Sequence, residues 1–270
     1  MCSRRIGVLA VQGAFAEHTA RLHQLGCETT ELRQLADLAQ PLDGLVLPGG
    51  ESTTQAKLLR DLGLLEPLRQ LVRGGLPVLG TCAGLILLAE TVESTGDGRH
   101  SEQNGERERP ARPAAAPSAA TETATAASAA SAVKQQSSAP LAAAIAGASA
   151  PEPLTAPPPE PPASSAIASP HPVEGFRTLP VTVRRNGYGR QLGSFTTAAP
   201  LHVKHGEGPL VPLTFIRAPR IVAMDPGVET LVALGSEPVA VRFGNQIGCC
   251  FHPELNDDNA LYQLFLSLSA

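Results

Sequence analysis

The chain has 270 residues, 43% of them apolar, which is enough for one large domain or two small ones with a sizeable core. Its 25 acidic and 21 basic side chains give a net charge of -4, with no dense cluster of Lys and Arg, which argues against nucleic acid and anionic membranes as partners. The apolar runs are shorter than a membrane span, and no targeting segment is recognisable before the first of them. The five cysteines are scattered and include no Cys-x-x-Cys pair, which favours a reducing, cytoplasmic setting without structural zinc.

Short apolar runs alternate with helical periodicity over the first 93 residues. Apolar runs without polar alternation are typical of strands that are buried on both faces of a parallel sheet. The expected strands are 6–11, 45–47 and 78–79, and the expected helices are 15–25, one with Ser52 as its N-cap, and 83–90. This alternation with short connections predicts a parallel sheet with helices on both faces.

The segment 94–172 has a different composition. Between Ala111 and Pro170, 47 of 60 residues are Ala, Pro, Ser or Thr. Because so few large apolar side chains cannot offset the entropy of ordering, we expect a disordered insertion, and we favour a passive surface loop over a docking or targeting role. The predicted organisation is the first part of a domain over 1–93, this low-complexity insertion over 94–172, and the second part of the domain over 173–270.

Beyond the insertion, apolar runs separated by turns predict six further strands. They are expected at 181–183, 213–216, 221–224, 231–234, 239–243 and 247–251. We expect them to extend the sheet with some antiparallel pairs, and we expect a last helix from about Asp257. The predicted fold class is therefore α/β, a single domain with a mostly parallel open sheet and helices on both faces, interrupted by the insertion.

Cys82 stands at the centre of the run GTCAG, residues 80–84, directly after the apolar run 76–79. A reactive residue flanked by glycines at minus two and plus two, between a strand and a helix, is typical of a nucleophile elbow. The small flanking residues allow a strained turn and a close approach of backbone and substrate. We therefore predict that Cys82 forms a covalent intermediate, which requires a base, an orienting group and an oxyanion hole.

Among the seven histidines, His252 is the best candidate for the base. His18 and His23 lie on the first predicted helix, where a solvent-exposed face is the default expectation, and the others fall in low-complexity or Gly-rich segments. His252 follows the predicted strand 247–251, at the end of a parallel sheet where sites form. Glu254 lies two residues further on and points the same way in an extended backbone, so it can orient the imidazole toward Cys82.

The oxyanion hole requires backbone N–H groups that point at one place. The N–H of Ala83 is one candidate, because it follows the nucleophile at the start of a helix. A second could come from the segment PGGES, residues 48–52, whose glycines allow geometries that expose N–H groups. An ordinary strand–helix turn explains the same glycines, so this segment alone leaves both interpretations open.

Together, the runs GTCAGL at 80–85 and FHPE at 251–254 resemble those of class I glutamine amidotransferases. Further runs are similar to the family of glutaminase subunits of pyridoxal 5'-phosphate synthases. These runs are GVLAVQGA at 7–14 with Glu17 and His18, LPGGESTT at 47–54, RNGYGRQ at 185–191, and FIRAP at 215–219. The resemblance spans nearly the whole chain outside the insertion, which stands where the family has a short loop.

The resemblance implies a glutaminase that delivers ammonia to a separate synthase subunit and needs no metal or cofactor of its own. It implies that Cys82, His252 and Glu254 are catalytic, and that Gly50 and Ala83 supply the oxyanion hole. The substrate L-glutamine is implied to bind at Gly50, Glu51, Ser52, Arg185, Ile216 and Arg217. An arginine suits the substrate α-carboxylate, with which it can pair bidentately, and a carboxylate suits the α-ammonium.

Three other functions are compatible with a cysteine elbow followed by a His–Glu pair. The first is a class I amidotransferase of another pathway, such as purine, histidine or carbamoyl phosphate synthesis. The motifs around Gln12 and Arg185 do not fit that alternative. A catalytically silent regulatory subunit is disfavoured because Cys82, His252 and Glu254 are all present. A cysteine hydrolase that acts on another substrate is the third.

Overall fold

The computed structural model describes residues 4–93, 173–188, 194–203 and 206–269, which all belong to one compact unit of the chain. Its main sheet has seven strands in the order β10-β11-β12-β4-β3-β1-β2. The strands are β1 (Arg5–Leu9), β2 (Glu28–Leu32), β3 (Gly44–Leu47), β4 (Val78–Thr81), β10 (Glu229–Leu234), β11 (Glu237–Phe243) and β12 (Gln246–Cys249). Strands β2, β1, β3, β4 and β12 are parallel, whereas β11 and β10 continue the sheet in antiparallel pairs.

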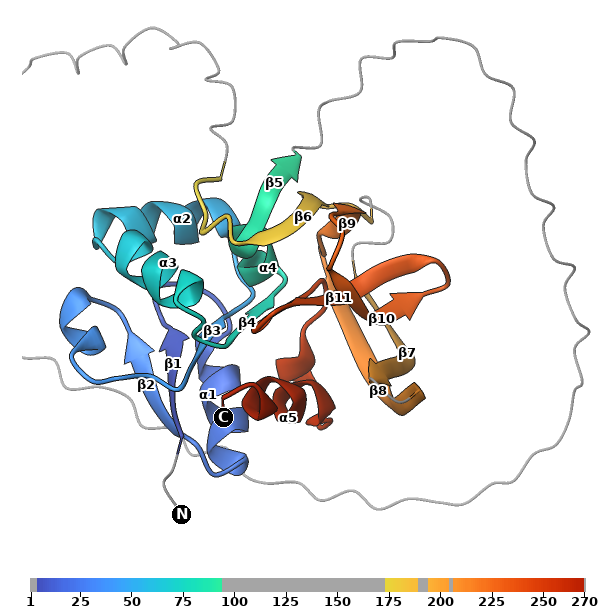
Figure 1. Ribbon diagram of the computed structural model, residues 1–270, viewed down its shortest axis with the longest axis horizontal. Coiled ribbons are helices and arrows are strands. Elements are labelled where there is room, and N and C mark those ends of the chain that lie inside the picture. The colour runs from blue at the N-terminus through green and yellow to red at the C-terminus, as the bar shows by residue number, and fades with distance from the viewer. Residues whose placement is uncertain (1–3, 94–172, 189–193, 204–205, 270) are drawn as a thin grey trace, which may run out of the picture. The chain divides into compact units, whose positions relative to one another are not determined.

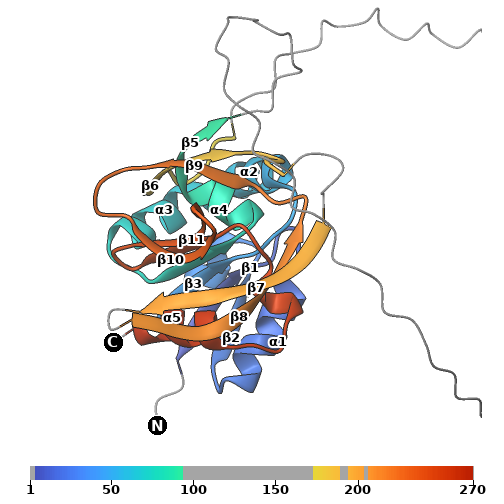
Figure 2. The ribbon, with the colours of Figure 1, turned by 90° about the vertical axis from the view of Figure 1, so that its right-hand side faces the viewer.

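Helices cover both faces of this sheet, as Figures 1 and 2 show. Helices α1 (Phe15–Gln24) and α5 (Ala260–Ser267) lie on one side, and α2 (Ser52–Asp61), α3 (Leu65–Arg73) and α4 (Ala83–Leu88) lie on the other. Two short 3-10 helices, η1 (Leu35–Leu38) and η2 (Pro253–Leu255), complete the set in the described residues. The predicted α/β class with a mostly parallel sheet is confirmed, while the expected disorder of 94–172 lies outside the described residues.

The second half of the chain departs in part from the predicted extension of the sheet. Only β10, β11 and β12 join the main sheet. A three-stranded sheet is formed by β5 (Ala89–Glu93), β6 (Leu179–Arg184) and β9 (Arg220–Met224), and a hairpin by β7 (Ser194–Val203) and β8 (Gly206–Ile216). The last helix begins at Ala260 rather than near Asp257.

Strand β4 lies at the centre of the main sheet, between β3 and β12. Its Leu79 is paired with Val46 on one side and with Ile247 on the other, and all three side chains are fully buried. Because the three strands are parallel and in this register, the segments that follow them emerge at the same edge of the sheet. The chain thereby brings together positions near 49, 82 and 252.

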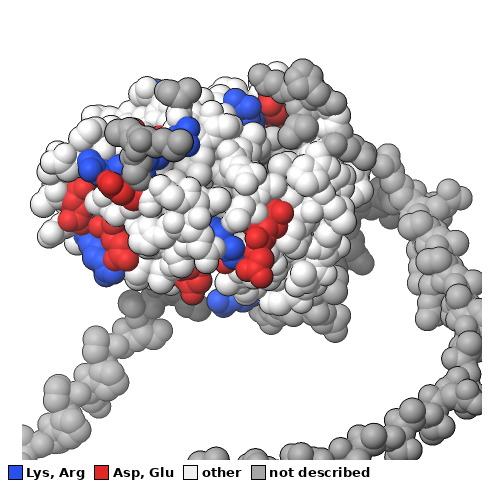
Figure 3. All heavy atoms as spheres, turned by 90° about the horizontal axis from the view of Figure 1, so that it is seen from below, with Lys and Arg blue, Asp and Glu red and all other residues white. Residues whose placement is uncertain are grey.

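Charged side chains are interspersed on the face of the unit shown in Figure 3, where basic and acidic groups lie next to one another. Ion pairs of this kind include Arg5 with Glu28 at 3.4 Å and Arg33 with Glu31 at 2.7 Å. These pairs are solvent-exposed and contribute little to stability.

Candidate active site

Cys82 occupies a strained elbow between β4 and α4. Its backbone has φ 49° and ψ -98°, a left-handed φ that is unfavourable for a residue with a side chain. The flanking glycines make this turn possible. A Cβ added to Gly84 would lie 1.9 Å from the carbonyl oxygen of Leu47, and one added to Gly80 would lie 2.8 Å from the carbonyl carbon of Gly84. The predicted elbow is therefore present, with its two glycines required by close backbone packing.

The elbow is anchored to the neighbouring strand and directs the thiol into the site. The N–H of Cys82 donates to the carbonyl of Cys249 at 2.8 Å, which continues the pairing of β4 with β12. The sulfur lies 4.0 Å from the carbonyl oxygen of Ile216, at the end of β8. Cys82 is only 6% exposed, so a substrate must enter a cavity to reach it.

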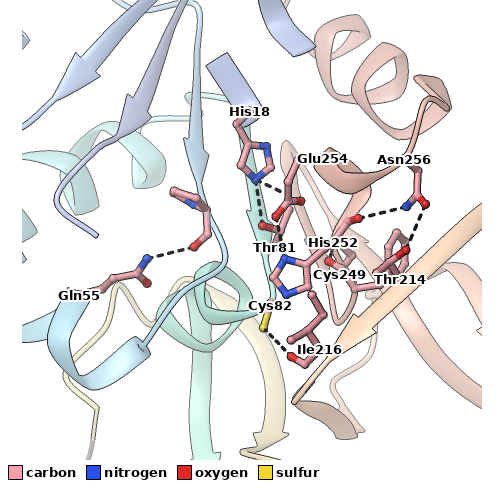
Figure 4. A network of polar contacts seen from close by, with 12 residues as sticks. His18, Gln55, Thr81, Cys82, Thr214, Ile216, Cys249, His252, Glu254 and Asn256 are labelled. Carbon is pink, nitrogen blue, oxygen red and sulfur yellow. Dashed lines mark hydrogen bonds and ion pairs between the residues drawn. The ribbon is translucent and has the colours of Figure 1, made fainter. Parts of the chain in front are cut away.

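His252 and Glu254 form a buried pair beside Cys82 (Figure 4). The Nδ1 atom of His252 lies 2.7 Å from Oε1 of Glu254, and the backbone N–H of His252 donates to the carbonyl of Thr214 in β8 at 2.8 Å. Burial opposes the imidazolium, but hydrogen bonds with the Cys82 sulfur and the Glu254 carboxylate outweigh it and raise the pKa of His252 to about 10. His252 is therefore suited to hold, as an imidazolium, a proton that it takes from the thiol.

Gly49 lets the segment after β3 approach this pair; it belongs to the segment 48–52 that the sequence offered for the oxyanion hole, although only Gly50 was predicted as a site residue. A Cβ added to Gly49 would lie 2.4 Å from Cε1 of His252 and 3.4 Å from Cβ of Cys82. The carbonyl of Gly49 accepts a hydrogen bond from the N–H of Ala14 at 3.0 Å. The C=O of Gly49 and the N–H of Gly50 belong to the same trans peptide and point in opposite directions, so the N–H of Gly50 points away from Ala14.

A cavity of about 290 Å³ opens at Cys82 and His252. It is lined by every residue predicted to bind substrate, namely Gly50, Glu51, Ser52, Arg185, Ile216 and Arg217. Gln12, Ile86 and Asn186 also line it and were not among the predicted site residues. The structure thus brings the predicted substrate positions together, and the cavity volume is close to the lower limit of the range for ligand cavities.

Glu51 organises the mouth of this cavity. Its carboxylate caps α2 by accepting from the N–H groups of Thr53 and Thr54 at 3.0 and 2.7 Å. Burial opposes the charge, but a hydrogen bond from the Thr54 hydroxyl at 2.7 Å and those from the two N–H groups prevail and lower the pKa of Glu51. The expectation that Ser52 caps this helix is therefore wrong, because the longer side chain of Glu51 reaches both N–H groups. Oε1 of Glu51 also lies 3.2 Å from Nη2 of Arg185.

His18 is fully buried, which contradicts its predicted place on a solvent-exposed helix face. It packs under the site, with Nε2 3.2 Å from Oγ1 of Thr81 and Nδ1 2.7 Å from the hydroxyl of Tyr262. The helix pattern contained a signal for this position, since His18 stands four residues before the buried Leu22 and shares its face. His23 is exposed, as expected.

A larger cavity, about 830 Å³, shares no lining residue with the site. It lies against α2, α3 and residues 173–177, and it is lined by Lys57, Arg60, Arg69, Arg73 and Arg177 together with Glu174. Several of these cations are already paired, such as Arg60 with Glu174 at 3.2 Å. It contains no nucleophile–base pair, so the smaller cavity is the site of chemistry.

The described part of the chain has neither a metal-binding cluster of side chains nor a membrane-spanning helix. No group of three or more His, Cys, Asp and Glu side chains there is arranged to hold a metal ion. No helix there is long and apolar enough to cross a membrane.

An open α/β sheet with a cysteine elbow, and a His–Glu pair after the adjacent strand, defines the class of glutamine amidotransferases. A crystal structure of a glutamine amidotransferase shares this fold with a TM-score of 0.63 and 30% sequence identity, covering 98% of each chain. Residues 8–102 and 164–269 match the model of the SNO glutamine amidotransferase family, and the chain belongs to that family. The predicted family is thereby confirmed.

The chain is also similar, over nearly its whole length, to proteins with assigned names. The chain is 40% identical over 262 residues to the pyridoxal 5'-phosphate synthase subunit PdxT of Desulfitobacterium hafniense (strain Y51), covering 97% of this chain and 92% of that protein. It is 37% identical over 266 residues to the PdxT subunit of Methanocorpusculum labreanum, covering 98% of both. The similarity to these proteins thus runs through both halves of the chain.

Proposed function

We propose that this protein hydrolyses glutamine to glutamate and ammonia, and that it delivers the ammonia to a synthase subunit that makes pyridoxal 5'-phosphate. The class of reaction follows from membership of the SNO glutamine amidotransferase family. The partner follows from the relatives, which are named as subunits of that synthase. One observation carries the proposal most directly: the strained Cys82 lies beside the His252–Glu254 pair at the floor of a cavity.

The charges at the cavity suit an α-amino acid. The guanidinium of Arg185 and the carboxylate of Glu51 lie 3.2 Å apart, so a zwitterion can place its α-carboxylate on the first and its α-ammonium on the second. Gly50, Ser52, Ile216 and Arg217 line the remainder of the cavity. A glutamine held in this way extends its side-chain amide toward Cys82.

The reaction is a two-step acyl transfer. His252 takes the proton of Cys82, and the thiolate attacks the amide carbon of glutamine. The N–H groups of Ala83 and Gly50 stabilise the oxyanion, while Glu254 holds the imidazolium in position. His252 then gives its proton to the leaving ammonia. Water, activated by the same imidazole, attacks the glutamyl thioester and releases glutamate.

The proposal is tested by mixing the full chain with its cognate synthase subunit and glutamine. Without the sugar phosphate substrates of the synthase, we expect equal amounts of glutamate and ammonia to be released. With these substrates present, we expect the ammonia to be incorporated and pyridoxal 5'-phosphate to form. A mixture in which the two subunits bind each other but glutamine is not consumed would contradict the proposal. Glutamine hydrolysis in the mixture without formation of pyridoxal 5'-phosphate would point to an amidotransferase of another pathway.

A further inference from the structure

His18 is a fully buried titratable group that the proposed reaction does not use. It lies on α1, and its Nε2 atom is 3.2 Å from Oγ1 of Thr81 and 3.4 Å from Oε2 of Glu254. Its other nitrogen, Nδ1, is 2.7 Å from the hydroxyl of Tyr262 on α5. Figure 4 shows the ring facing Glu254, which also contacts His252. Glu254 is therefore approached by two imidazoles, one at each oxygen.

The ring of His18 is neutral and carries one proton. Burial lowers its pKa, and this effect outweighs the opposing attraction of the Glu254 carboxylate. Burial also raises the pKa of Tyr262, so the phenol keeps its proton and can donate it to Nδ1. The proton of the imidazole then sits on Nε2.

The surroundings of Nε2 favour the same tautomer. Oε2 of Glu254 is buried and has no hydrogen-bond partner among the described residues. A proton on Nε2 can be donated to Thr81 and places a positive dipole 3.4 Å from this oxygen, whereas a lone pair on Nε2 would oppose the carboxylate. A buried charged oxygen without any donor dipole is costly, so the arrangement with Nε2–H is the stable one.

We infer that His18 is a positioning residue, whose Nε2–H, fixed by Tyr262, holds Glu254 so that its other oxygen stays on Nδ1 of His252. The inference rests on the proposed function, because it concerns the same His252 and Cys82. A neutral donor suits the task. It orients the carboxylate without a positive charge that would compete with the His252 imidazolium for Glu254.

The charged and titratable groups around His18 come from several elements. Glu254 and His252 face it from the segment after β12, and Glu17 is its neighbour on α1. Tyr262 faces it from α5, and Cys249 of β12 lies near both Glu254 and Tyr262. The reactivity of Cys82 in a His18 variant must therefore be compared with that of wild type over a range of pH rather than at one pH.

The test measures alkylation of Cys82 by iodoacetamide as a function of pH in the full chain, followed by mass spectrometry of the peptide that contains Cys82. This readout needs neither glutamine nor the synthase. His18→Met removes the ring donors at similar volume, His18→Gln can keep a donor near the Nε2 position, and His23→Gln is the control on the exposed face of the same helix. We expect His18→Met to lower the alkylation rate at neutral pH about tenfold and to shift its rise to higher pH. His18→Gln should recover part of the loss, and His23→Gln should match wild type.

A second measurement needs no substitution in the protein that is observed. In the ¹⁵N NMR spectrum of histidine-labelled wild type, the His18 ring, assigned by its loss in His18→Gln, should be neutral with the proton on Nε2. A proton on Nδ1, a protonated ring at neutral pH, or a wild-type alkylation profile in folded His18→Met would overturn the inference. If glutamine is not hydrolysed by the wild-type complex, the proposed function fails, while these two measurements still decide the role of His18.

Discussion

Glu254 is the residue on which the electrostatics of the site depend. It is 5% exposed, and its Oε1 lies 2.7 Å from Nδ1 of His252. Burial alone would raise its pKa, but attraction to His18 in the protonated form that this ring takes at low pH, together with the hydrogen bond and charge of His252, lowers it, so that the carboxylate stays ionised. A charge of this kind fixes the tautomer of His252 and favours its protonated form next to Cys82.

Replacing Glu254 with Gln tests that role at nearly constant size. The amide can donate to Nδ1 and thereby select the wrong tautomer of His252, so we expect kcat for glutamine hydrolysis to fall by roughly 10³–10⁴. KM should change little, because Glu254 does not line the cavity. Steady-state kinetics in the complex with the synthase subunit measure both constants. A kcat within a factor of about ten of wild type would assign the orientation of His252 to another group.

The raised pKa of His252 also predicts how stability depends on pH. Its value of about 10 in the folded protein exceeds the ordinary 6.5, so its contribution is complete below pH 6.5 and is lost as the pH rises through about 10. Glu254 is one of the groups that raise the pKa of His252. The difference in free energy of unfolding between wild type and Glu254→Gln should therefore become smaller as the pH rises from 6.5 to about 10. Urea denaturation at both ends of the range checks this. A difference that stays constant would show that the pair does not stabilise the imidazolium.

At the scale of elements, the site depends on how closely α4 packs against β3. Gly84 lies in the first turn of α4, with no space for a side chain between it and the carbonyl of Leu47. Gly84→Ala forces the helix away from the strand, and we expect it to lower the free energy of unfolding by about 1–3 kcal/mol or more and to reduce kcat. Chemical denaturation and glutaminase kinetics measure the two effects.

Gly74→Ala is the matched control for this change. Gly74 has an ordinary φ of -72°, and an added Cβ would approach no atom closer than 3.2 Å. We expect a loss of less than about 1 kcal/mol and unchanged kinetics. If both alanine variants behaved alike, close packing at the elbow would not explain why Gly84 is a glycine.

The elements that the sequence predicted well are those with continuous apolar runs. Strands β4 and β12 are buried on both faces, so their runs at 78–79 and 247–251 indicated them, and their parallel placement predicted that Cys82 and His252 meet. Strand β2 was missed because it lies at the sheet edge and buries only Leu32. Strand β7 was missed because Pro200 and small residues interrupt its pattern.

The parts of the site that were not predicted depend on contacts between distant segments. Gly49 approaches His252 across 203 positions of sequence, and only the fold shows that a Cβ would meet the ring. His18 meets Tyr262 across 244 positions, through the packing of α1 against α5. A local pattern can indicate that a residue is buried, but the partner of a buried polar group is set by tertiary structure.

At the scale of the whole molecule, residues 94–172 connect two parallel neighbours, β5 and β6. Parallel neighbours need a crossover of about a dozen residues or more, which is far shorter than this segment. Deletion of Arg109 to Ser169 leaves 94–108 and 170–178 as the connection between the two strands. We expect kcat, KM and synthase binding within about twofold of wild type, because loop length has a small energetic effect. Kinetics and sedimentation of the mixture measure these. Lost synthase binding in a variant whose Cys82 still reacts with iodoacetamide would assign a docking role to the segment.

The central claim is that Cys82 is the nucleophile of a glutaminase, and one measurement tests it most directly: the rate of glutamate release by Cys82→Ala in complex with the synthase subunit. We expect a fall of at least about 10⁴-fold with subunit binding intact, while Cys27→Ala, which replaces a buried cysteine outside the cavity, keeps the wild-type rate. Glutamate release by Cys82→Ala at a rate near that of wild type would contradict the account and require another nucleophile.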